Sequence, residues 1–311
     1  MDNRVSRPFH LLILLLFLIL LGTCASSIYF INDEPAVTSA ETFTPALMLG
    51  VTPAAPLAST PVLSVPPIQI PSVSPAFASG SDPNWSLLLP GLERRVIQIY
   101  DNMNQPVESL HVWRLDQNYF RLDVAYNERP KSLETWQRET NALMVVNGGF
   151  YSIANERYFP DGLTIVNGTA SGRSFSGSAG MLAIDGSRAE LRWLLQKPYN
   201  SSEPLQAALQ SFPILVQPGG GLGFGAEREN HVSARRTAIG QDKEGRILFM
   251  VAPQGYFTLH QLSVYLTESD LNLDIAVNLD GGGSTGILVA NPPEIIPPSR
   301  PLPFVILVYG R

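Results

Sequence analysis

Short runs of alternating or continuous apolar residues predict strands along most of the chain after about residue 92. Apolar and polar positions alternate over Val96–Tyr100, Ser109–Leu115 and Tyr119–Tyr126, as in half-buried strands, and the Asp-Gln-Asn between the last two predicts a hairpin. Continuous apolar runs over Ile247–Ala252 and Asp274–Leu279 predict buried strands. The final apolar run, which begins FVILVYG, predicts one more strand at the end of the chain.

Three segments carry the capping residues of helices. Ser132 precedes a short polar segment that ends at Thr140, and Thr258 precedes leucines spaced along one helical face. Ser202, with Pro204 in the following turn, predicts another helix through AALQSF. Strands nevertheless outnumber helices, and the early hairpins exclude a purely alternating order of strands and helices. We therefore expect an α+β fold with a mixed, largely antiparallel sheet and a few packed helices in a single globular domain.

The N-terminus has the pattern of an export signal. Arg4 and Arg7 precede an apolar run from Leu11 to Leu21, which continues more weakly to Ile31. This length favours an uncleaved membrane anchor over residues 1–31 with its basic end in the cytoplasm, and a cleaved signal is the alternative. A third alternative is a lipoprotein, because Cys24 lies in LLGTC, although the threonine before it departs from the usual lipidation motif.

Composition divides the rest of the chain in two. Residues 32–83 are rich in proline, serine, alanine and threonine, which predicts an extended tether, and residues 84–311 have the composition of one globular domain. A tether after an anchor places this domain on the extracytoplasmic side of the membrane. The net charge of −6 and the lack of a large basic cluster argue against a nucleic-acid partner.

Four glycine-containing loops beside predicted strands carry residues capable of chemistry. They are VVNGGFY, in which two glycines permit positive φ, then FPDGLTIVNG, SARRTAIG and AVNLDGGGSTGI. In the last loop, a carboxylate, three glycines and two hydroxyls within six residues suit an anion or a sugar. In SARRT, one arginine of the pair is expected to face solvent, and the other could bind a phosphate or carboxylate in a pocket.

In their order and spacing, these loops, together with FPILVQPGG, resemble the phosphodiester glycosidase family, whose domain occurs in the enzyme that uncovers mannose 6-phosphate and in many bacterial exported proteins. The resemblance covers most of residues 92–311. It implies hydrolysis of the bond between a sugar anomeric carbon and a phosphodiester in an envelope or extracellular glycan. The site residues that it implies are Asn147, Gly148, Gly149, Phe150, Asp161, Gly162, Arg236, Asn278, Asp280, Gly281, Gly282, Ser284 and Thr285.

Within this set we expect Asp280 and Asp161 to be the catalytic carboxylates. Arg236 and the backbone N–H groups of the glycine loop are expected to bind phosphate, and Asn147 and Asn278 to contact sugar hydroxyls.

No cofactor is predicted. The four histidines lack ligand spacing, and a divalent cation between the two aspartates is left open. The alternative function is a non-catalytic envelope protein that binds anionic glycans or exopolysaccharide, which would need the same arginine and glycine loop.

Overall fold

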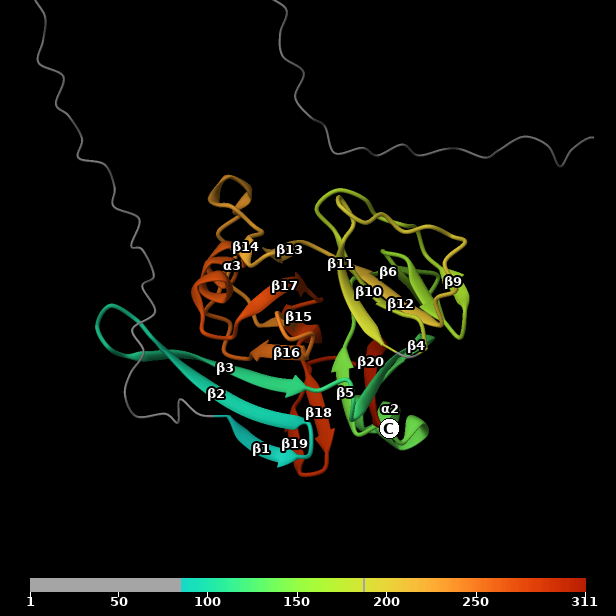
Figure 1. The fold of residues 1–311 in the computed structure, drawn as a ribbon, viewed down its shortest axis with the longest axis horizontal. Coiled ribbons are helices and arrows are strands. Elements are labelled where there is room, and N and C mark those ends of the chain that lie inside the picture. Colours follow the sequence, from blue (N-terminus) through green and yellow to red (C-terminus); the bar gives the residue numbers. More distant parts are fainter. Residues whose placement is uncertain (1–84, 187) are drawn as a thin grey trace, which may run out of the picture. The chain divides into compact units, whose positions relative to one another are not determined.

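The computed structural model describes residues 85–186 and 188–311, which belong to one compact unit of the chain. The predicted anchor and tether lie outside these residues. No helix in the described part of the chain is long and apolar enough to cross a membrane. Most of the regular structure consists of strands (Figure 1).

The strands form three sheets and a separate hairpin. The largest sheet has the order β1 (Ser86–Leu89), β2 (Leu92–Tyr100), β3 (Pro106–Leu115), β16 (Ile247–Ala252), β15 (Arg236–Asp242), β17 (Leu273–Asn278), β13 (Ile214–Gln217) and β14 (Gly221–Leu222). The second has the order β11 (Ala189–Trp193), β10 (Gly180–Ile184), β12 (Ala207–Ser211), β8 (Thr164–Val166) and β9 (Thr169–Ser171). The third has the order β19 (Pro293–Ile296), β18 (Ile287–Ala290), β5 (Met144–Asn147), β20 (Leu302–Gly310) and β4 (Phe120–Lys131). The hairpin joins β6 (Tyr151–Ala154) to β7 (Arg157–Pro160).

Every strand pairing in the described residues is antiparallel. The expectation of a largely antiparallel fold with few helices in one domain is confirmed, whereas the expectation of one mixed sheet is wrong. The early strands belong to different sheets, and this distribution is decided by contacts between segments far apart in the sequence.

Two of the three predicted helices form. Helix α2 (Leu133–Thr140) begins after Ser132, whose hydroxyl accepts from the backbone N–H of Thr135. Helix α3 (Leu259–Glu268) begins after Thr258, which forms a capping box with Gln261. These caps satisfy N–H groups that have no partner within the helix, so the local sequence alone fixes where both helices start.

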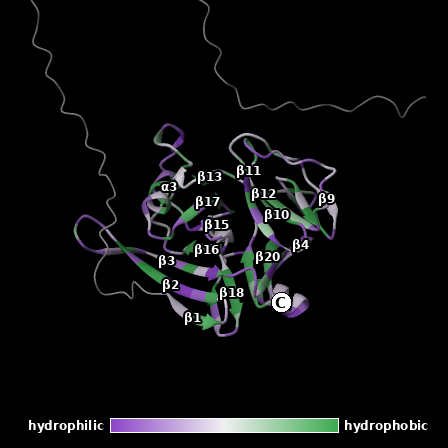
Figure 2. Cartoon of the chain, viewed as in Figure 1, coloured by the Kyte–Doolittle hydropathy of each residue, from purple (hydrophilic) through white to green (hydrophobic). Residues whose placement is uncertain are grey.

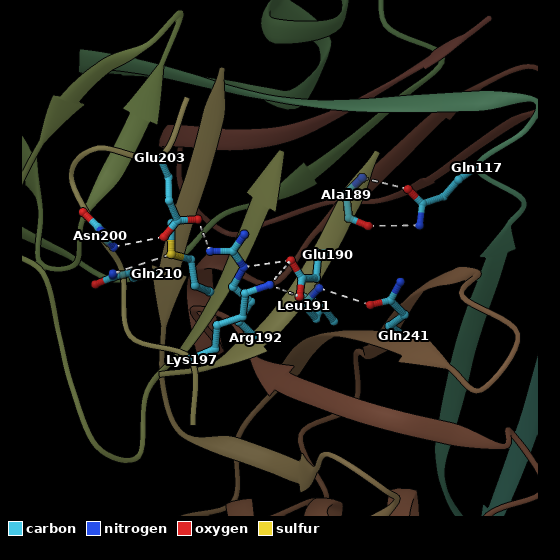
Figure 3. Close-up of polar contacts among 11 residues, drawn as sticks. Gln117, Ala189, Glu190, Leu191, Arg192, Lys197, Asn200, Glu203, Gln210 and Gln241 are labelled. Carbon is cyan, nitrogen blue, oxygen red and sulfur yellow. Dashed lines mark hydrogen bonds and ion pairs between the residues drawn. The ribbon is translucent and has the colours of Figure 1, made fainter. Parts of the chain in front are cut away.

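The helix predicted after Ser202 does not form. Its second half is strand β12, which is buried throughout and pairs with β10 and β8. Its first half is a turn in which the Glu203 carboxylate accepts from the backbone of Asn200 and from Arg192 (Figure 3). A buried place in a sheet overrides the helical propensity of AALQ.

The Asp-Gln-Asn segment turns the chain, but it does not pair the two strands that flank it. Strand β3 pairs with β2 and β16, whereas β4 pairs with β20. The side-chain amide of Gln117 instead exchanges two hydrogen bonds with the backbone of Ala189 on β11 (Figure 3). The predicted hairpin is therefore wrong, and the segment connects two sheets.

A shared core lies between the three sheets. It contains Trp113 and Phe249 from the largest sheet, Leu209 from the second, and Met144 and Ile306 from the third. Further apolar clusters lie on the other faces, one under α3 and another under α2. Figure 2 accordingly shows hydrophobic colour along β18 and β20 and a mixture along β2. Burial on both faces explains the continuous apolar runs in the sequence.

Candidate active site

The loop from Leu279 to Gly286 passes from β17 in the largest sheet to β18 in the third. Its first residue past the core, Asp280, donates its backbone N–H to the carbonyl of Gly148, 3.1 Å away, in the loop that follows β5. Strand β15 runs antiparallel to β17, which places Arg236 beside the same loop. Three of the four sequence motifs therefore meet where two sheets meet.

A cavity of about 640 Å³ opens at this point. It is lined by Phe150, Tyr151, Ile153, Arg236, Asp280, Gly281, Gly282, Gly283, Ser284 and Arg300. Six of these residues belong to the predicted site: Phe150, Arg236, Asp280, Gly281, Gly282 and Ser284. The cavity thus combines one carboxylate with two guanidinium groups.

Asp280 has a perturbed acidity. Burial raises the pKa of its carboxyl, and the nearby negative charge of Asp161 acts in the same direction. Hydrogen bonds from the Ser284 hydroxyl and the Gly281 N–H, and the positive charge of Arg300, offset part of this pKa increase. A carboxylate whose pKa lies above its ordinary value is a better proton acceptor near neutral pH, as general base catalysis requires.

Arg236 is a buried cation that is only partly satisfied within the protein. Its Nε donates to the carbonyl of Phe257 at 3.1 Å, and one terminal nitrogen donates to the carbonyl of Val232 at 2.6 Å. The other, Nη1, lies 3.9 Å from the position that a Cβ on Gly281 would occupy. Burial lowers the pKa of Arg236, which the charge of Glu229 opposes, yet arginine stays protonated in proteins. An anion in the cavity would therefore find a fixed positive charge.

A second cavity, of about 350 Å³, shares Phe150, Arg236 and Gly281 with the first. The rings of Phe150 and Phe212 stack there with centroids 4.5 Å apart. Asn278 also lines this cavity, and its Nδ2 donates to the carbonyl of Phe212. Its Oδ1 is buried without a partner in the described residues, so a bound hydroxyl or amide N–H could satisfy it. This geometry suits the predicted contact of Asn278 with a sugar.

Asn147 has a different place from the one predicted. Its side chain is 1% exposed and lines neither cavity. The Nδ2 group donates to the carbonyl of Asp280 at 2.7 Å, and the Oδ1 atom accepts from the Thr237 hydroxyl and the Gly286 N–H. Both polar atoms are occupied, so a hydrogen bond to a sugar hydroxyl does not fit. Asn147 instead positions the loop that carries Asp280.

Three predicted glycines are explained by packing, and none of them has the positive φ that the sequence suggested for the pair after Asn147. A Cβ on Gly149 would lie 3.0 Å from the carbonyl oxygen of Gln210 in β12, and a Cβ on Gly162 would lie 2.9 Å from the same atom. A Cβ on Gly148 would overlap the ring of Phe304. These residues let two loops approach the sheets closely and do not line either cavity.

The backbone of the glycine loop is also largely occupied. The N–H of Gly282, the loop residue with positive φ, donates to the carbonyl of Arg235 at 2.8 Å. Those of Ser284 and Thr285 donate within the loop, and that of Gly281 donates to the Asp280 carboxylate. The prediction that the loop's N–H groups bind phosphate is therefore wrong for Gly281, Gly282, Ser284 and Thr285. The arginine side chains are left as the main groups that balance the charge of an anion.

Asp161 and Thr285 lie near the cavity without lining it. The Asp161 carboxylate accepts from the Ser152 hydroxyl, and its backbone N–H donates to the carbonyl of Phe150. Its effect on the pKa of Asp280 shows that the two carboxylates interact electrostatically. Thr285 is fully buried and its hydroxyl has no partner in the described part of the chain, so direct contact with a substrate does not fit.

The sequence did not single out Arg300, Phe212 or Glu229. Glu229 accepts from the backbone N–H groups of His231 and His260 at 2.9 and 2.8 Å. Burial would raise the pKa of Glu229, but hydrogen bonds hold it below its ordinary value, so a negative charge persists near Arg236. The sequence marks two of these residues only by their neighbours: Phe212 precedes a proline, and Arg300 interrupts a proline-rich segment.

The described residues contain no group of three or more histidine, cysteine, aspartate or glutamate side chains suited to a metal ion. A divalent cation between Asp161 and Asp280 would therefore have fewer than three such side chains as ligands.

The fold is similar to that of known proteins. A zebrafish N-acetylglucosamine-1-phosphodiester alpha-N-acetylglucosaminidase catalytic domain, auto-inhibited by its pro-peptide, matches with a TM-score of 0.58 and 18% identity, over 72% of this chain and 85% of that one. A hypothetical protein from Synechocystis matches with a TM-score of 0.51 and 13% identity, over 74% of this chain and 64% of that one. No curated protein sequence matches significantly.

At these identities the structural matches establish the fold alone. The sequence itself supplies the family, because a model of the phosphodiester glycosidase domain matches residues 140–309. This range contains all four motifs and both cavities described above, and it covers more than half of the 311 residues. The chain therefore belongs to the phosphodiester glycosidase family.

Proposed function

We propose that this protein hydrolyses the bond between a sugar anomeric carbon and a phosphodiester. The observation that carries the proposal is the pairing, in one cavity, of a carboxylate with raised pKa, Asp280, and a buried arginine, Arg236, that has a free nitrogen. The zebrafish relative is named for an activity of this class.

In the reaction, Asp280 accepts a proton from a water molecule as the water oxygen forms a bond to the anomeric carbon. The bond between that carbon and the bridging oxygen breaks, and its electron pair stays on the phosphate. The products are the free sugar and a phosphomonoester, and Asp280 returns its proton to solvent. Phosphate leaves as an anion, so the reaction needs neutralisation of charge more than a proton donor.

Arg236 supplies this neutralisation. Its guanidinium is held at two positions by carbonyl groups, and so it is aligned before the substrate arrives. Fixed donors aimed at developing charge are worth more in a buried site than in water. Asn278 and the stacked Phe150 and Phe212 would hold the sugar in the adjoining cavity.

Asp161 then acts through Asp280. Its negative charge destabilises the ionised form of the buried carboxylate and makes it a stronger base. In glycosidases, the separation of the two carboxyl groups determines whether the anomeric configuration is retained or inverted. Analysis of the anomeric form of the released sugar would establish which outcome applies.

We place the reaction outside the cytoplasmic membrane. This proposal rests on the basic and apolar N-terminus and on the proline-rich segment that follows it. Protease added to intact cells should digest the globular domain if the placement is right. Protection until the cells are lysed would contradict it.

The central test is sugar release by the full-length protein from UDP-GlcNAc and from an alkyl phospho-GlcNAc. We expect Asp280→Asn to reduce turnover by a factor on the order of a hundred or more while binding persists. An anionic-glycan binder without catalysis would release no sugar, and its affinity would stay the same or increase in Asp280→Asn. A chelator that leaves wild-type turnover unchanged would count against a divalent cation.

A further inference from the structure

Arg300 is a second cation at the same cavity. It lies between β19 and β20, is exposed, and lines the cavity together with Asp280 and Arg236. No hydrogen bond or ion pair joins its side chain to another of the described residues, 85–186 and 188–311. An anion in the cavity could therefore bind Arg300 without breaking a hydrogen bond or an ion pair.

The segment that carries Arg300 is fixed against the glycine loop. The backbone N–H of Ser299 donates to the carbonyl of Gly283 at 2.8 Å. Arg235 donates to the carbonyl of Pro297 at 2.9 Å and to the hydroxyl of Ser299 at 3.4 Å. Two consecutive prolines restrict the backbone just before this point. The position of Arg300 is thus set by the same loop that carries Asp280.

The absence of a side chain at residue 283 makes room for this guanidinium. A Cβ there would lie 2.6 Å from Nε of Arg300, whereas a Cβ on Gly281 would lie 3.9 Å from Nη1 of Arg236. With consecutive Cα atoms about 3.8 Å apart, these two glycines are at most about 7.6 Å apart. The two guanidinium groups therefore lie beside neighbouring parts of one loop, Arg236 buried and Arg300 at the solvent-exposed rim.

We propose that Arg300 binds a second phosphate group, so that the substrate is a sugar attached to a diphosphate. This inference rests on the proposed function and names its substrate class. Arg236 takes the phosphate bonded to the sugar, and Arg300 takes the next phosphate toward solvent. The bond that breaks is the one between the anomeric carbon and the first phosphate oxygen, which releases the sugar and an intact diphosphate.

The first test compares two substrates, UDP-GlcNAc and phenyl phospho-GlcNAc, which carry two phosphates and one. For Arg300→Gln in the full-length protein we expect kcat/KM to fall roughly 10- to 100-fold on UDP-GlcNAc, because a charge-assisted hydrogen bond is lost, and about 3-fold or less on the phenyl substrate. Arg300→Lys should recover part of the loss. Arg138→Gln, which removes an exposed arginine on α2, is the control and should match wild type. Equal losses on both substrates would overturn the proposal.

The second test does not need turnover, so it separates this inference from the proposed function. Calorimetry should show that UDP binds wild type at least about 10-fold more tightly than UMP and that Arg300→Gln abolishes the difference. Equal binding of UDP and UMP by wild type would refute a second phosphate site even if sugar release is observed. Tighter binding of farnesyl diphosphate than of UDP would indicate a lipid-linked substrate, and the reverse would indicate a nucleotide sugar.

Discussion

Replacing Glu294 by glutamine tests how the strand that leads to Arg300 is held. Glu294 lies on β19 and receives two hydrogen bonds, at 3.0 and 2.6 Å, from Arg94 on β2 of the largest sheet. Arg94 in turn lies over the ring of Trp113, 4.1 Å from its centroid. The substitution keeps the shape of the side chain and removes its charge.

The expected cost follows from the acidity of this group. Burial would raise the pKa of Glu294, but His111 and Arg94 lower it from the ordinary 4.5 to about 2. At about 1.36 kcal/mol per pKa unit, that difference corresponds to roughly 3.4 kcal/mol of folding free energy. The side chain is 35% exposed, so solvent screens the pair, and we expect about 1.5 kcal/mol.

The sign of the pH dependence is determined by the lowered pKa. The stabilisation is fully present above the unfolded value of about 4.5, and it is lost as pH falls toward about 2. Urea unfolding of wild type and Glu294→Gln should therefore differ by about 1.5 kcal/mol at pH 7 and by about 0.6 kcal/mol at pH 3. The control is Glu128→Gln, whose partner Arg157 is 63% exposed, and it should change stability by less than about 0.5 kcal/mol. The same loss for Glu294→Gln at both pH values, or a loss equal to the control's, would refute the reasoning.

Three further predictions concern the site. Asp161→Asn should move the acid limb of the pH profile of kcat/KM to lower pH, because removing this charge lowers the pKa of Asp280. An acid limb at the same pH would mean that Asp161 does not influence the pKa of Asp280. Gly283→Ala should displace Arg300 and reduce the preference for UDP-GlcNAc over phenyl phospho-GlcNAc, with sugar release from the phenyl substrate as the internal control. Gly148→Ala should cost about 1–3 kcal/mol in urea unfolding, because the added methyl meets the buried Phe304 ring; a neutral result would contradict the packing role.

The sequence predicts local structure well where the deciding contacts are local. The caps at Ser132 and Thr258 form as expected because each hydroxyl accepts from a backbone N–H three residues later. The segment after Ser202 fails for the opposite reason. Its outcome depends on Arg192 and on strands β8 and β10, which lie elsewhere in the sequence and provide a buried place in a sheet.

The same distinction holds within the site. The resemblance implied both Asp280 and Arg236, whereas the residues by themselves indicated an anion-binding loop at Asp280 and left open which arginine of the Arg235–Arg236 pair faces a pocket. The resemblance implied that Asn147 contacts the substrate, and nothing local in the sequence shows that its amide bonds to the carbonyl of Asp280, 133 residues later. The two glycines after it are likewise required by distant residues, because a Cβ on either would lie too close to Gln210 or Phe304.

The adjacent arginines Arg235 and Arg236 depend both on local sequence and on contacts with distant residues. The sequence predicts that one arginine of the Arg235–Arg236 pair faces solvent and that the other could face a pocket. Arg236 begins β15 and lines the cavity, whereas Arg235 precedes the strand and donates to the carbonyl of Pro297. Their partners differ in kind: Arg236 faces the cavity with one nitrogen free, and Arg235 holds the segment that ends at Arg300. If the diphosphate proposal is right, Arg235→Gln should weaken UDP binding more than UMP binding although Arg235 lines neither cavity. Equal weakening would mean that Arg235 supports the whole cavity and does not specifically position Arg300.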